Sequence, residues 1–130
     1  AIPFLSLQDA TTKPVFDDKG ILKEESADLI SFPFGTRDTD PDIYALEIFG
    51  QEVLPHYQEG DILLVSPSSQ QRRGDKVIIK RSQISVLLYG QRRRITETRA
   101  DLVAYGSSDT ETSLDRTEIS WMSRILWASQ

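Results

Sequence analysis

The stretch YALEIFGQEVLPHYQEGDILLV, residues 44–65, decides the fold. It begins inside an alternating apolar run over 42–50, which predicts a strand that is buried on much of both faces. A second, shorter apolar run over 61–66 follows Gly60 and Asp61 directly and also predicts a strand. Glycine can adopt a positive φ at a tight turn, and an aspartate side chain can accept hydrogen bonds from nearby backbone amides. The stretch therefore predicts two strands connected through a braced turn.

A second Gly-Asp pair, Gly74 and Asp75, precedes the apolar run over 75–81 in the same way. A further run over 84–90 follows a short connection, so we expect these two runs to form a hairpin. No long window shows a helical stripe. The sequence thus predicts a mostly β domain of short strands, either a small barrel or a folded sheet. The other expected elements are an N-terminal strand over 1–7, an edge strand over 92–99, a strand over 101–106, a polar loop over 107–119 and a final strand over 120–128.

The chain divides into a less regular part, residues 1–41, and the strand-rich part, residues 42–130. We interpret residues 1–41 as an arm that lies across the rest of a single domain, because its apolar residues are too numerous for a free linker. The first residues have no leader pattern, so we expect a domain taken from a longer protein.

The composition suits a soluble globular domain, with 38% apolar and 27% charged residues in a chain of 130. The chain has no cysteine, which excludes disulfides, thiolate metal sites and thiol catalysis and fits a cytoplasmic location. No apolar run approaches the ~20 residues of a membrane helix, so no membrane association is expected.

The charge is distributed unevenly along the chain. Residues 1–61 carry a net charge of −9, residues 62–100 carry +7 and residues 101–130 carry −3. The acidic and basic parts could attract each other within one molecule or across a dimer. The pI of about 4.8 argues against nucleic-acid binding by this segment alone.

The spacing of glycines, proline and aspartates over residues 44–80 resembles the C-terminal domain of LexA and phage CI-type repressors, a module related to signal peptidases. The segment 119–130 resembles the closing strand of a bacterial branch whose members carry an N-terminal helix-turn-helix. The resemblance implies a compact β-rich module that commonly dimerises and that binds DNA only through an upstream helix-turn-helix domain. The residues that carry the motif are Gly50, Pro55, Gly60, Asp61, Gly74 and Asp75.

The catalytic residues of that family are not matched. Its members use a serine two positions after the glycine and a lysine base in a later strand; these positions hold Glu52 and Leu87. A serine needs a base to accept its proton, and a lysine serves only when burial lowers its pKa. The family's self-cleavage bond aligns near Ala10-Thr11, where the usual glycine is missing. We therefore expect a former active site without peptidase activity, cofactor or metal.

The resemblance predicts the oligomerisation and regulatory domain of a bacterial or phage-derived transcriptional regulator, acting as a homodimer. The candidate interface is the final strand, because large aromatic residues on a terminal strand are typical interface anchors. Two of its aromatic residues share parity and are expected on one face. The interface candidates are Trp121, Ile125 and Trp127.

Other readings of the same residues stay open. The vacated cleft could bind a peptide or a small molecule, with Glu52 recognising a cation, or a divergent peptidase could use a serine such as Ser85. His56, the only histidine, is expected to be a partly exposed loop residue. Lys76 and Lys80 are expected to face solvent, although either could pair with Glu52. The arginines at hairpin ends could block aggregation of a sheet edge or dock an acidic partner; they are Arg72, Arg73, Arg92, Arg93 and Arg94.

Overall fold

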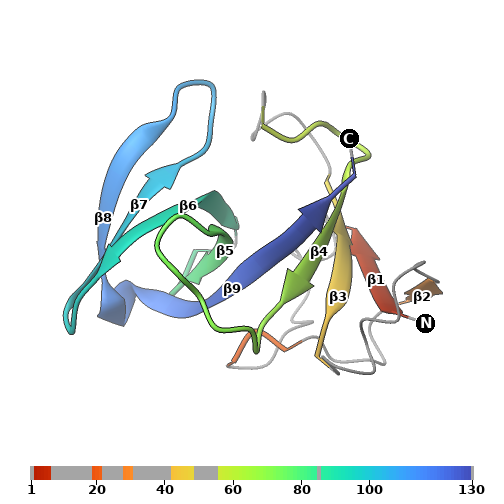
Figure 1. Cartoon of the computed structure of the whole chain (residues 1–130), viewed down its shortest axis with the longest axis horizontal. Coiled ribbons are helices and arrows are strands. Elements are labelled where there is room, and N and C mark those ends of the chain that lie inside the picture. The colour runs from red at the N-terminus through yellow and green to blue at the C-terminus, as the bar shows by residue number, and fades with distance from the viewer. Residues whose placement is uncertain are drawn as a thin grey trace.

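The sheet is continuous through all nine strands of the described residues (Figure 1). The computed structural model describes residues 2–6, 19–21, 28–30, 42–48, 56–84 and 86–129. Its strand order is β2-β1-β3-β4-β9-β5-β6-β7-β8, with antiparallel pairing everywhere except between β1 and β3. The strands are β1 (Ile2–Ser6), β2 (Asp28–Ile30), β3 (Tyr44–Glu47), β4 (Ile62–Ser66), β5 (Lys76–Arg81), β6 (Leu88–Ile95), β7 (Arg99–Ala104), β8 (Thr110–Asp115) and β9 (Ile119–Ala128), with a short 3-10 helix, η3 (Arg116–Glu118), before β9.

Strand β9 connects the two halves of the sheet. Its first half pairs with β5 and its second half pairs with β4. Figure 1 shows β9 running diagonally between one half, formed by β1 to β4, and the other, formed by β5 to β8. The sheet does not close among the described residues, so the mostly β fold predicted from the sequence is confirmed in its folded-sheet form.

Buried residues lie on both faces of the central strands. On β5, Ile78 joins the largest apolar cluster, whereas Val77 and Ile79 join a separate one with Leu102 and Leu114. On β3 the alternation is the same, which confirms the prediction of a strand buried on both faces. The largest cluster contains residues of both halves of the sheet, whereas each of the two smaller clusters lies within one half.

In the first half of the described chain the strand boundaries lie close to those predicted, whereas in the second half the strand boundaries differ from the prediction. The hairpin of β5 with β6 is confirmed, but β6 begins at Leu88 rather than at 84 and continues to Ile95. It therefore unites the predicted strand over 84–90 with the start of the predicted edge strand over 92–99.

The predicted loop over 107–119 is wrong. It contains β8, which pairs with β7, and η3. Strand β8 is difficult to recognise because only Leu114 in it is buried. Helix η3 begins with a capping box, in which Asp115 accepts from the Thr117 amide at 2.9 Å and Glu118 accepts from the Asp115 amide at 3.2 Å. None of the helices in the described residues is both long and apolar enough to cross a membrane.

Candidate functional site

The first Gly-Asp turn fastens the start of β4 to the end of β3. Gly60 has φ +93°, and the Asp61 carboxylate accepts a hydrogen bond from the Gln58 amide at 2.9 Å. The Gly60 amide donates to the Ile48 carbonyl at 2.9 Å, and the Ile48 amide donates to the Asp61 carbonyl at 2.8 Å. Both predicted functions, positive φ for the glycine and amide capping for the aspartate, are confirmed here.

The second turn repeats this geometry between β5 and β6. Gly74 has φ +97°, and the Asp75 carboxylate accepts from the Arg72 amide at 2.8 Å. The Gly74 amide donates to the Arg92 carbonyl, and the Arg92 amide donates to the Asp75 carbonyl, each at 2.8 Å. The two turns thus share one hydrogen-bond pattern: the first holds β4 against β3, and the second holds β5 against β6.

The residue expected at the position of the family's nucleophile, Glu52, falls between Ile48 and the first Gly-Asp turn. Gly50, Glu52 and Pro55 lie outside the described residues, as do Ala10-Thr11 and Ser85. His56 and Tyr57 are the first described residues that follow Pro55.

Leu87, the residue expected at the position of the family's lysine, is buried. Its side chain is 4% exposed and belongs to the largest apolar cluster, together with Ile48, Tyr57 and Tyr89. A lysine here would be desolvated, which is the condition that makes a lysine neutral and basic. Leucine offers no atom that can accept a proton, so this position contributes apolar packing and no acid–base chemistry.

A chain of aromatic rings connects the loop to β6. The His56 ring stacks on Tyr105, with centroids 3.7 Å apart and planes at 15°. Tyr57 contacts both Tyr105 and Tyr89 edge to face, with centroids 6.2 Å apart in each case. Such pairs stabilise by about 0.5–1.5 kcal/mol beyond their buried area. The rings therefore hold the end of the loop against the strand that follows Leu87.

Burial dominates the acid–base behaviour of these tyrosines. It raises the pKa of Tyr57 to about 12, with a further contribution from Tyr105. The pKa of Tyr105 is also raised, by burial and by the nearby Asp109 carboxylate, and Arg93 opposes this shift. Burial likewise raises the pKa of Tyr44 in β3. All three phenols are therefore neutral near pH 7 and cannot act as bases there.

His56 has an ionic partner that the sequence did not indicate. Its Nε2 lies 2.8 Å from each carboxylate oxygen of Asp109, in the connection between β7 and β8. The expectation of a partly exposed loop residue is confirmed. The pairing was missed because 53 residues separate the two side chains and no motif links them.

The lysines of β5 differ in their surroundings. Lys76 is exposed, as predicted, whereas Lys80 is half-buried. The Lys80 Nζ donates to the carbonyls of Arg81 at 2.7 Å and Ile84 at 2.5 Å, so it braces the connection to β6. This turn also contains Gln83 at φ +62°.

The three interface candidates on β9 have different environments. Trp121 and Ile125 are each 7% exposed and belong to the main apolar cluster, whereas Trp127 is 42% exposed. The pairing of β9 with β4 shifts register between Ile125 and Trp127. This irregularity breaks the strand alternation and corrects the expectation that Trp121 and Trp127 share a face.

Trp121 is covered by the N-terminal part of the chain. Gly20, at φ +79°, lies so close that a Cβ there would be 2.7 Å from the indole ring. Trp121 is therefore a core residue, and the exposed apolar side chains at the end of β9 are Leu126 and Trp127.

Comparison with known proteins gives one match. The family model described as Peptidase S24-like covers residues 8–126, which is most of the chain. No curated protein and no solved structure matches. The match spans both Gly-Asp turns, Leu87 and nearly all of β9.

Proposed function

The chain belongs to the Peptidase S24-like family, and on that premise we propose that it is a catalytically inactive member that serves as the oligomerisation and regulatory domain of a transcriptional regulator. In this proposal the domain forms a homodimer, and DNA is bound by an upstream helix-turn-helix domain. Pairing two such DNA-binding domains raises affinity because two half-sites are bound at once.

The burial of Leu87 is the observation that carries the proposed loss of activity. A peptidase of this type needs a serine and a base, and the residues at the two positions are Glu52 and a leucine in an apolar cluster. Lys80 does not replace the missing base, since its Nζ donates hydrogen bonds to two backbone carbonyls. Without self-cleavage, such a regulator would be released by a ligand, a partner or turnover.

Leu126 and Trp127 support the placement of the dimer interface at the end of β9. They are 38% and 42% exposed, although both are large apolar side chains. Exposed apolar side chains of this size favour a protein–protein contact when they are adjacent. The chain just after them is tied to β4: the Ile62 amide donates to the Ser129 hydroxyl at 2.8 Å, and the Ser129 amide donates to the Ile62 carbonyl at 2.9 Å.

Two experiments test this proposal. Sedimentation over a wide concentration range should show a dimer, and Trp127→Arg should convert it to a monomer. Val86→Arg is the matched control, because Val86 is 45% exposed but lies in the connection between β5 and β6. A persistent monomer, or dissociation by Val86→Arg alone, would contradict the proposed assembly.

The second experiment tests the loss of activity. The protein is incubated at neutral and mildly alkaline pH, and its intact mass is followed by mass spectrometry. We expect no fragment. A fragment that accumulates at alkaline pH and disappears in Lys80→Met or Ser85→Ala would show instead that a divergent peptidase has recruited other residues.

A further inference from the structure

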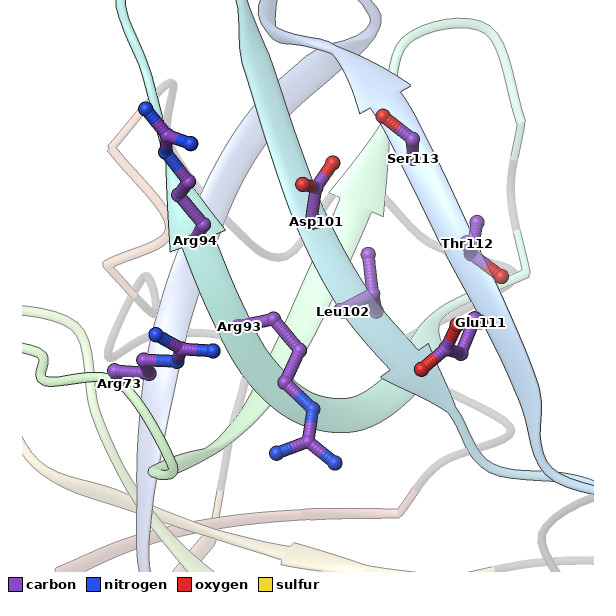
Figure 2. Close-up of a pocket in the computed structure, with 8 residues that line it drawn as sticks. All are labelled: Arg73, Arg93, Arg94, Asp101, Leu102, Glu111, Thr112 and Ser113. Carbon is purple, nitrogen blue, oxygen red and sulfur yellow. The ribbon is translucent and has the colours of Figure 1, made fainter.

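A hollow over β6, β7 and β8 is lined by three arginines and two acidic residues, among others. It has a volume of about 640 Å³ and lies across β6, β7, β8 and the second Gly-Asp turn. Figure 2 shows the side chains around it, with Arg93 and Arg94 on β6 and with Asp101 and Glu111 on the neighbouring strands. The volume is within the range of about 300–1,000 Å³ that is typical of ligand sites.

The backbone brings the three arginines together. The second Gly-Asp turn is tied to β6 by the two hydrogen bonds of Arg92, and this places Arg73, the residue before Gly74, beside β6. Arg93 and Arg94 occupy a β-bulge, because between the pairs Arg92↔Leu102 and Ile95↔Ala100 they both face a single residue of β7. That residue is Asp101. A bulge of this kind redirects side chains, and here it leaves two adjacent arginines on the rim of one hollow.

The three guanidinium groups have no anionic partner within the described residues. The ion pairs there are His56 with Asp109 and Arg124 with Asp75, and none involves Arg73, Arg93 or Arg94. All three arginines are exposed. They therefore keep their full hydrogen-bonding capacity for a ligand, and guanidinium forms its strongest hydrogen bonds with carboxylates and phosphates.

The two acidic residues of the hollow, Asp101 on β7 and Glu111 on β8, restrict which anion can bind there. Asp101 and Glu111 would repel the continuous phosphate backbone of a nucleic acid. Separate carboxylates, spaced by the alternation of an extended peptide, can approach the arginines and avoid these acids. A basic side chain in the same peptide could form an ion pair with Asp101 or Glu111. We propose that this groove docks an extended acidic peptide segment of a partner protein.

The test uses a short capped peptide of alternating aspartate and serine, titrated into the full chain by calorimetry at low and at high salt. Binding should weaken with salt. Arg73→Gln, Arg93→Gln and Arg94→Gln should each weaken it by about 3- to 10-fold, as expected for the loss of one charged hydrogen-bond donor. Arg72→Gln is the matched control: it removes the same charge next to Arg73, but its side chain does not line the groove. Thermal melts verify that each variant folds.

A second set of variants examines the acidic wall. Asp101→Asn and Glu111→Gln should tighten binding of the aspartate–serine peptide and weaken binding of a peptide that alternates aspartate with lysine. No binding by the wild type, an equal loss in Arg72→Gln, or tighter binding of an oligonucleotide or of inorganic phosphate would each overturn the proposal. Trp127→Arg should leave peptide affinity unchanged, so that a failure here and a failure of the proposed dimer are told apart.

Discussion

At position 87, leucine and lysine would have opposite effects on this domain. Leu87 is part of the main apolar cluster and is almost fully buried, so it stabilises the domain by packing. A lysine at this position would bury an amine, which would cost stability and lower the pKa of the amine. The side chain at this position thus decides whether the cluster gains apolar packing or must accommodate a desolvated amine.

Leu87→Ala should lower the free energy of unfolding by about 2–5 kcal/mol, because it leaves a cavity in the cluster. Leu87→Met, which keeps the volume, should cost less than about 1.5 kcal/mol. Urea denaturation at neutral pH measures both. Equal, small effects would mean that Leu87 is not packed as described.

Leu87→Lys should show a deficit that depends on pH. Burial lowers the pKa of the lysine in the folded state, so the unfolded state binds more protons and stability rises with pH up to the unfolded pKa of about 10.4. Each unit of pKa depression corresponds to about 1.4 kcal/mol. Its stability relative to the wild type, measured by urea denaturation from pH 7 to 10, should therefore recover as the pH rises. A pH-independent difference would place the amine in solvent.

At the scale of elements, the two Gly-Asp turns are the repeated unit of this fold. Each combines a glycine at positive φ, an aspartate that caps an amide and a pair of backbone hydrogen bonds to a neighbouring strand. The first turn fastens β4 to β3, and the second fastens β5 to β6. The second also positions Arg73 beside the bulge in β6, so one local motif contributes to both the fold and the proposed docking groove.

Gly60→Ala and Gly74→Ala should each lower the free energy of unfolding by about 1–2 kcal/mol, because a left-handed conformation is unfavourable for alanine. No atom lies within 4 Å of a Cβ added at either position, so the loss would come from the backbone alone. Gly106→Ala is the control: its φ is not positive and its nearest contact is an ordinary 3.7 Å. Equal stability of all three variants in urea would show that the turns carry no conformational strain.

At the scale of the whole molecule, the folded sheet encloses tyrosines from different strands in one core. Tyr44 lies on β3, Tyr57 follows the loop before β4 and Tyr89 lies on β6, and all three belong to the same apolar cluster. No hydrogen-bond partner of the Tyr57 hydroxyl is present in the part of the chain that the structure describes. Burial raises the pKa of Tyr44 and of Tyr57, and this couples global stability to alkaline pH.

Stability should fall as the pH rises above about 10. The folded-state pKa of Tyr57 is about 12 and that of Tyr44 is also raised, so between the unfolded value of about 10 and these pKa values the folded state binds more protons. The slope should approach about 1.4 kcal/mol per pH unit for a fully buried phenol. Urea midpoints between pH 8 and 12 measure it, and Tyr44→Phe or Tyr57→Phe should flatten the curve. A wild-type curve that stays level would contradict this burial.

The sequence by itself determined the fold class, both Gly-Asp turns and the hairpin of β5 with β6, because these depend on local backbone preferences and on alternation within short segments. It also predicts, through the family resemblance, that leucine stands at the position of the family's lysine. Contacts between residues that are far apart in the sequence could be learned only from the tertiary structure. The bulge in β6 brings Arg93 and Arg94 opposite Asp101. The irregular pairing of β9 with β4 leaves Trp127 exposed, although Trp121 in the same strand is buried. His56 contacts Asp109, which lies 53 residues away in the sequence. Strand β8, almost entirely polar, is a strand because β7 offers it a free edge, and no pattern within its own residues could show that.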